Sequence, residues 1–264
     1  MLIDRLDSVP IILIIILTVV VVLAAIEIGF RIGRWRRDVS TGLAESEAQL
    51  SAMTGAHLAL LAFIMAFSFS MAAGHYQERR ALIMEDVNAI STAYLRAELI
   101  GGEDGEVIRK ALYQYTVARA EVGDLEQAPA MIRESERLQM EIWQQIQSLI
   151  NNNQVTIIHS LLIQSVNEVF DIHEARLAAG LKNRVPRVLW AILAGLLTLA
   201  MLGIGYFSGA KGSRNPIAST GLALSFSLVL IMIADLDRPA GGSVRADQGP
   251  MIALRDKLSA DFGQ

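Results

Sequence analysis

The stretch LAFIMAFSFSMAAGHYQERR, residues 61–80, decides the fold that we predict for this chain. It begins as an apolar run suited to a bilayer and ends in the charged residues 78–80, without a proline. Between residues 53 and 100 the only glycines are Gly55 and Gly74. We therefore predict one helix that crosses the membrane and continues into water, roughly 70 Å long at 1.5 Å per residue.

The composition places the whole chain among membrane proteins. Of its 264 residues 53% are hydrophobic, and the mean hydropathy is +0.41, which is too apolar for an ordinary soluble domain. The apolar residues form four blocks of about the 20 residues that a bilayer-spanning helix needs. The blocks are Pro10–Phe30, Met53–Gly74, Val188–Phe207 and Ile217–Ala234. We predict an all-α membrane protein with four transmembrane helices, the first of them a retained anchor.

The blocks divide the chain into four parts. Residues 10–74 hold spans one and two with a basic short loop, and residues 188–236 hold spans three and four. Residues 75–187 are polar with apolar positions at helical spacing, which predicts a helical extramembrane bundle continuous with span two. Breaks in it are expected at residues 101–105, 123–129 and 151–153, and the tail 237–264 should hold a short helix from Pro250.

Several classes of function find no support in the residues. The net charge of −4 and the lack of a basic face argue against nucleic-acid binding. There is no cysteine for a thiolate metal site or nucleophile, and no Ser-His-Asp spacing, phosphate loop or zinc signature. The spacing of Asp171, His173 and Glu174 does not gather three ligands on one helical face. We predict neither an enzyme nor a cofactor or metal site.

One face of span two carries an aromatic and small-residue stripe, formed by Phe63, Phe67, Ser70 and Gly74 at helical spacing. Small and hydroxyl-bearing residues are enriched where membrane helices pack closely, so the stripe can be a packing face. Rings and small groups on one face can also line an ion path that closes by dewetting. Both interpretations stay open at this stage.

Span four repeats the Ser-Phe-Ser pattern of span two. Ser225 and Ser227 flank a phenylalanine, and Gly221 lies one turn before them. Hydroxyls in lipid find partners only on other helices. The repetition favours a polar seam between spans two and four, or towards a neighbouring subunit.

Charged residues are expected where the spans meet water. These interfacial residues are Glu27, Arg31, Arg80, Asp235, Asp237 and Arg238. Glu27 precedes Arg31 by four residues, the favourable order for an ion pair on a helix. The two aspartates at the end of span four either mark the water boundary, pair with arginines, or form a cation site or gate.

The short loops indicate an orientation. The loop after span one carries four arginines within residues 31–37, and the loop after span three carries Lys211 and Arg214. Positive residues in short loops favour the cytoplasmic side, which would make segment 75–187 periplasmic. The flanks of that segment are basic too, so the reverse orientation stays open.

Three motifs resemble the bestrophin-like family of uncharacterised bacterial membrane proteins. They are FSFSMAAGHYQERRALIMEDVNAISTAYLRAEL (67–99), VPRVLW (185–190) and DLDRPAGGSVR (235–245), and the likeness covers nearly the whole chain. The resemblance implies four spans with a helical insertion between the second and third, in a bacterial inner membrane.

A more distant similarity to true bestrophins has further implications. Those are pentameric channels, mostly selective for anions, whose second span forms a hydrophobic neck and whose large domain is cytoplasmic. The likeness implies a homo-oligomer in the lipid bilayer, such as a pentamer, that passes inorganic anions. Phe63, Phe67 and Ser70 or Met71 would then be neck positions. The alternative is a non-transporting membrane sensor or scaffold with a helical-bundle domain.

Overall fold

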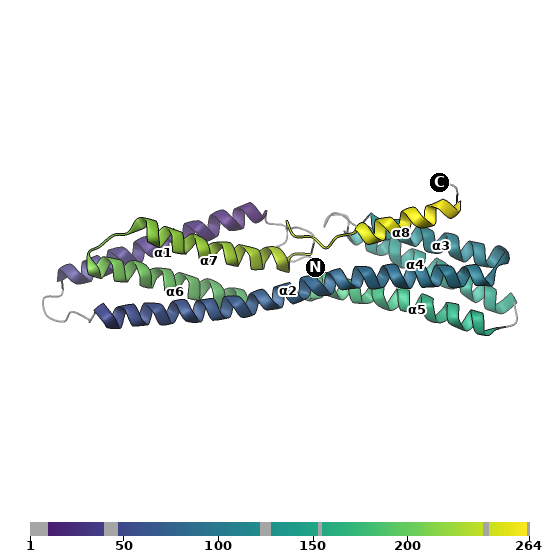
Figure 1. Cartoon of the computed structure of the whole chain (residues 1–264), viewed down its shortest axis with the longest axis horizontal. Helices are drawn as coiled ribbons and strands as arrows, with labels where there is room; N and C mark the ends of the chain where they lie inside the picture. The colour runs from purple at the N-terminus through teal and green to yellow at the C-terminus, as the bar shows by residue number, and fades with distance from the viewer. Residues whose placement is uncertain (1–9, 40–46, 122–127, 153–154, 240–242, 263–264) are drawn as a thin grey trace. The chain divides into compact units, whose positions relative to one another are not determined.

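The computed structural model describes residues 10–39, 47–121, 128–152, 155–239 and 243–262. The expected breaks at residues 123–127 and at residue 153 lie outside these ranges. Every regular element in the described ranges is helical (Figure 1). The helices are α1 (Ile11–Val39), α2 (Glu47–Ile100), α3 (Gly102–Ala120), α4 (Ala128–Asn152), α5 (Ile157–Leu177), a π-turn (Ala178–Lys182), α6 (Arg187–Lys211), α7 (Pro216–Asp237), α8 (Gly249–Ser259) and a 3₁₀ turn (Ala260–Phe262).

Four helical stretches are long and apolar enough to cross a membrane. They contain the four apolar blocks of the sequence apart from Pro10, which directly precedes α1. They correspond to α1, α2, the stretch that ends with α6, and α7. Helix α2 has 54 residues without a break, about 80 Å along its axis at 1.5 Å per residue. This confirms the prediction that a single helix includes residues 53–100.

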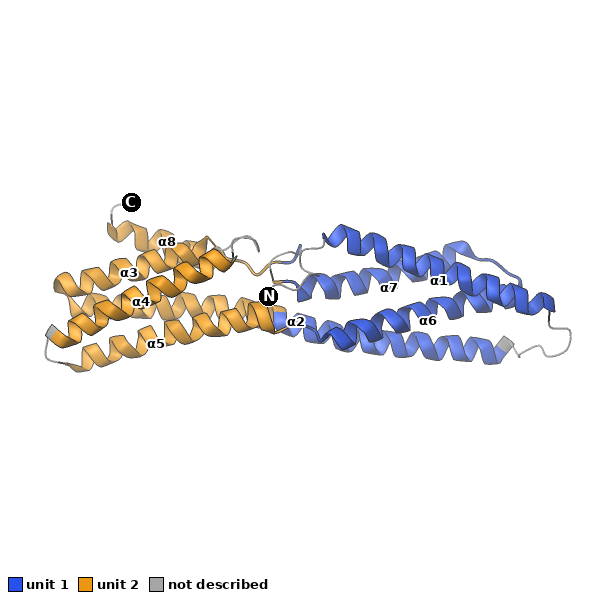
Figure 2. Ribbon diagram, turned by 180° about the vertical axis from the view of Figure 1, so that it is seen from behind, with its two compact units in different colours: residues 1–75, 184–238, 242–244 blue, residues 76–183, 239–241, 245–264 orange. Residues whose placement is uncertain are grey.

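The chain forms two compact units, coloured separately in Figure 2. Unit 1 contains residues 1–75, 184–238 and 242–244, and so includes the apolar blocks. Unit 2 contains residues 76–183, 239–241 and 245–264. Helix α2 contributes residues to both units.

Unit 1 is built on a close crossing of α1 and α6. Two glycines of α1, Gly29 and Gly33, lie against the main chain of α6, and Gly205 and Gly209 of α6 lie against the main chain of α1. A Cβ atom at any of the four would overlap a backbone carbonyl of the facing helix. The reciprocal pair of Gly-x-x-x-Gly motifs thus lets two membrane helices approach at backbone distance. Helix α7 packs against both.

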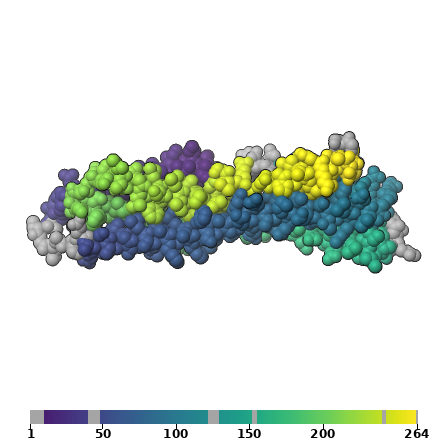
Figure 3. Space-filling model, viewed as in Figure 1, coloured from purple at the N-terminus to yellow at the C-terminus, as the bar shows by residue number. Residues whose placement is uncertain are grey.

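Unit 2 has a conventional apolar core. It draws on α2, α3, α4, α5 and α8, and its largest fully buried side chains include Ile90, Leu112, Tyr115, Ile142 and Leu162. Helix α8 packs against α3, and both are visible on the face shown in Figure 3. Helix α8 is therefore part of this core.

The turn between α2 and α3 uses glycine for its backbone conformation. Gly101 and Gly102 have φ values of 69° and 61°, a region that side chains disfavour. Gly105, expected in the break, lies inside α3 instead. It is buried against the carbonyl oxygen of Ala97, so its role is close packing of the two helices and not helix termination.

Candidate functional site

The stripe on α2 lies on the surface of the chain. Phe63 is 68% exposed and Phe67 is 54% exposed. Ser70 and Gly74 are exposed as well, and a Cβ added to Gly74 would meet no atom within 4 Å. Within the described chain, the four residues therefore present a continuous uncovered face.

The opposite face of α2 packs against the rest of the chain. Leu61, Met65, Ser68 and Ala72 are each at most 3% exposed. Their spacing of three and four residues defines one face of the helix. The hydroxyl that enters the protein interior is thus that of Ser68 and not that of Ser70. The exposed stripe is left for lipid, a second copy of the chain or a pore.

The residues of the predicted seam on α7 point in two directions. Gly221 and Ser225 are exposed, and the Ser225 hydroxyl donates to the Gly221 carbonyl at 2.9 Å within the same helix. Ser227 is buried, at 1% exposure. In the part of the chain that the structure describes, the buried hydroxyls of Ser68 and Ser227 both lack a hydrogen-bond partner.

Two interfacial charges of α1 form a group with an arginine of the loop between α6 and α7. Arg31 Nε lies 2.9 Å from Glu27 Oε1, the pairing expected from the sequence. Arg214, in the loop between α6 and α7, pairs with the other carboxylate oxygen of Glu27. Its guanidinium carbon also lies 4.7 Å from the centre of the Phe30 ring.

The two aspartates at the end of α7 hold backbone segments in place. Asp235 accepts hydrogen bonds from the Ser243 amide at 2.7 Å and from the Val244 amide at 3.1 Å. Asp237 accepts from the Val185 amide at 2.8 Å and lies 4.0 Å from His75 Nδ1. These contacts give both acids a structural role at the end of the span.

The two arginines of the predicted interfacial set differ in burial. Arg238, at the C-terminal end of α7, is only 5% exposed. Arg80, on α2, is exposed.

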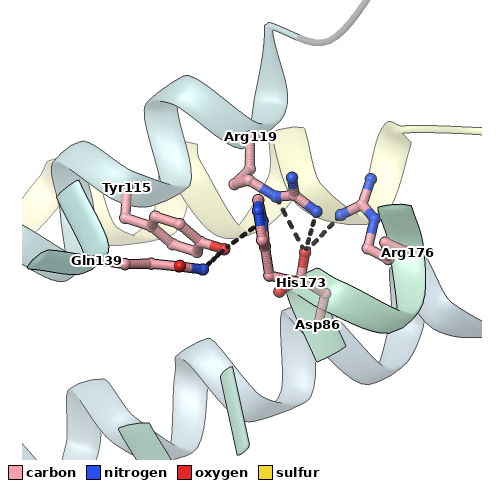
Figure 4. Close-up of polar contacts among 6 residues, drawn as sticks. All are labelled: Asp86, Tyr115, Arg119, Gln139, His173 and Arg176. Carbon is pink, nitrogen blue, oxygen red and sulfur yellow. Dashed lines mark hydrogen bonds and ion pairs between the residues drawn. The ribbon is translucent and has the colours of Figure 1, made fainter. Parts of the chain in front are cut away.

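Unit 2 contains a buried charge cluster that the sequence reasoning missed (Figure 4). Asp86 of α2 is fully buried and accepts from two guanidinium groups. Arg119 of α3 donates through Nε at 3.3 Å and Nη2 at 3.1 Å, and Arg176 of α5 donates through Nη1 at 2.5 Å. One carboxylate thus joins three helices, and the cluster carries an excess of one positive charge.

A second polar group lies beside this cluster. The Tyr115 hydroxyl is 3.3 Å from His173 Nδ1 and accepts from Gln139 Nε2 at 3.4 Å, as Figure 4 shows. Burial, and then the charge of Arg119, lower the pKa of His173 to about 4, although Asp86 acts in the opposite direction. Burial also raises the pKa of Tyr115. Both rings are therefore uncharged at neutral pH.

A sequence signal for the cluster existed. Asp86 lies three residues after Ile83 and four before Ile90, both of which are buried, so a carboxylate interrupts an apolar stripe. A buried carboxylate needs cationic partners, which predicts arginines on the facing helices. His173 lies on the apolar stripe of α5, as the sequence indicated, and is fully buried. Among the described residues, no group of three or more acidic or histidine residues is arranged to hold a metal ion.

Comparisons with known proteins agree with this architecture. A family model described as a bestrophin-like domain matches residues 18–251. The fold resembles crystal structures of point variants of a bacterial bestrophin homologue from Klebsiella pneumoniae. One is 16% identical with a TM-score of 0.69, covering 96% of this chain and 99% of that chain. Another is 15% identical with a TM-score of 0.70, and the match covers 95% of this chain and 99% of that chain. No curated protein matches the chain.

Proposed function

Because the chain belongs to the bestrophin-like family, we propose that it forms a passive ion channel whose path is lined by α2. It is a multi-pass membrane protein with four candidate spans. In the proposal, copies of the chain surround an axis and turn the stripe of Phe63, Phe67, Ser70 and Gly74 towards it. The observation that carries the proposal is the exposure of this stripe beside a fully packed opposite face.

The chemistry of the stripe suits a gate. A narrow ring of phenylalanine side chains repels water, and a dewetted constriction blocks ions without a solid plug. Ser70 and Gly74 follow one and two turns after Phe67 and would widen and wet the path. A small rotation of α2 about its axis would move the rings and allow water to enter.

The assembly is a symmetric homo-oligomer, for which the bestrophin likeness favours a pentamer. A closed ring of identical subunits follows naturally when one helix face of every copy meets the same axis. Gly221 and Ser225 are then available for contacts between copies, since both are exposed in the protomer. The permeant ions proposed are inorganic anions.

Residues 75–187 form the extramembrane helical part in this proposal. Basic residues of the short loops favour a periplasmic position for it, whereas the bestrophin likeness favours the cytoplasm of a bacterial cell with the protein in the inner membrane. A reporter enzyme fused at Gly101, in the turn between α2 and α3, distinguishes the two orientations.

Anion flux from liposomes tests the function. Purified protein reconstituted in vesicles should release entrapped chloride down its gradient, and Phe67→Ala should change the rate by removing one ring from the constriction. Phe69→Ala is the matched control, because Phe69 lies on the same helix but faces away from the stripe. Absence of flux, or an identical response to both variants, would favour the non-transporting sensor or scaffold instead.

A further inference from the structure

A cavity of about 230 Å³ lies in unit 1, where α6 ends and α7 begins. Its wall includes Glu27 and Phe30 of α1, Ser208 of α6, and Arg214 of the connecting loop. Helix α6 ends at Lys211, three residues after Ser208. The cavity therefore lies where the spans leave the apolar zone, at the level of lipid headgroups.

The charges at this cavity favour an anion. Glu27 pairs with Arg31 through Nε and with Arg214 through Nη2, so the three residues together carry one positive charge. A guanidinium group has five N–H donors, and each of these ion pairs uses one. The Arg31 side chain is 78% exposed and the Arg214 side chain is 58% exposed, so both arginines can reach a phosphate group at the membrane surface. Guanidinium groups match phosphate geometry with paired hydrogen bonds.

The wall changes from polar to apolar along α1. Leu23 and Ile26 line the side towards the middle of the span, together with Gly205, while the hydroxyls of Ser208 and Ser219 line the rest. The volume is several times the roughly 30 Å³ that one water occupies in the liquid. A phospholipid has the same order of groups, with an anionic phosphate next to ester oxygens and acyl chains.

We propose that this cavity binds the headgroup phosphate of an anionic phospholipid. Arg214, in the wall, holds the phosphate together with Arg31, which does not line the cavity but pairs with the same Glu27. The acyl chains follow Leu23 and Ile26 into the bilayer. Inorganic phosphate is also an anion, but it has no acyl chains to contact the apolar wall. The inference requires that the spans lie in a membrane, but it does not depend on ion conduction or on the orientation of the chain.

Native mass spectrometry of the intact detergent-solubilised protein tests the site. The protein is incubated with phosphatidylglycerol or with the zwitterionic phosphatidylcholine. Phosphatidylglycerol should be retained more strongly, and Arg214→Gln should reduce its retention about tenfold, the loss of one charge-assisted hydrogen bond. Arg34→Gln is the control, since it removes the same charge from an exposed position on α1 whose ion pair is with Asp38 and not with Glu27 of the cavity wall.

A second variant tests whether the cavity itself, and not only the charge of Arg214, is needed for lipid binding. Ser219→Leu fills the cavity without changing the charge and suits a membrane helix, so it should also lower phosphatidylglycerol retention. Excess inorganic phosphate should leave retention unchanged. Equal retention of the two lipids, equal effects of Arg214→Gln and Arg34→Gln, or displacement of the lipid by inorganic phosphate would overturn the assignment.

Discussion

Substitution of Asp86 should destabilise unit 2 more than any other single charge removal in it. Asp86→Asn keeps the shape of the side chain and removes its charge. Arg119 and Arg176 then remain buried beside a neutral amide, with only 5% of Arg119 exposed and 11% of the Arg176 side chain exposed. Burial and the charge of Arg119 already lower the pKa of Arg176 in the intact cluster.

The magnitude follows from the cluster geometry. Removal of one partner from a buried ion pair leaves an uncompensated charge and costs about 3–5 kcal/mol. Among the described residues, the hydrogen bonds from Arg119 and Arg176 to a carboxylate all end on Asp86 Oδ2, and no second acid shares the charge there. Proteins are stable by about 5–15 kcal/mol in total, so the substitution should remove roughly a fifth or more of the free energy of unfolding.

Denaturant unfolding followed by Trp143 fluorescence measures this change. Trp143 packs 6.4 Å from the Phe170 ring in unit 2, and substituting the other two tryptophans by phenylalanine leaves it as the sole reporter. Asp171→Asn, at an exposed carboxylate of α5, is the control and should alter stability by less than about 0.5 kcal/mol. A loss below about 1 kcal/mol for Asp86→Asn would refute the reasoning that the cluster is a buried ionic centre.

Two further predictions concern His173 and the α1–α6 crossing. The pKa of His173 is lowered from 6.5 to about 4 by burial and then by Arg119, so unfolded protein binds more protons between these values. The contribution of neutral His173 to the free energy of unfolding is therefore fully present above pH 6.5. It falls by up to about 3 kcal/mol as the pH drops to 4, at 1.36 kcal/mol per pH unit. His173→Phe should flatten that part of a pH series of unfolding curves, and an unchanged slope would contradict the assignment. Gly205→Ala should lower the free energy of unfolding by about 1–3 kcal/mol, because the new methyl group collides with the Ile26 carbonyl. The loss should appear as a lower melting temperature. Gly203→Ala has room for its methyl group and should be neutral or stabilising; equal melting temperatures would argue against the close crossing.

The long helices and the turn at Gly101 could be predicted from the sequence. The four apolar blocks and the uninterrupted run after residue 53 predict long helices because few alternatives satisfy the backbone in lipid. The break at Gly101 was also predictable, since consecutive glycines favour turns. The stripe on α2 was visible as spacing, but its exposure was not, because spacing alone does not say which face of a helix meets another helix.

The spacing of residues in the sequence did not predict which helices contact each other. Gly29 and Gly205 are 176 positions apart in the chain, and only the fold shows that their motifs cross each other. The Gly-x-x-x-Gly pattern is readable in the sequences of α1 and α6 and predicts some close crossing, but not the partner. In the same way, Asp86 signals a buried charge, while its pairing with Arg119 and Arg176 depends on how three helices pack.

The position of Phe67 in the assembled protein tests the central claim most directly. A structure of the protein in lipid nanodiscs, determined by electron cryo-microscopy, gives subunit number and the environment of this ring together. The channel account predicts a closed ring of subunits with Phe63 and Phe67 of every copy facing a central axis. A monomer or dimer in which Phe67 contacts only lipid would contradict it.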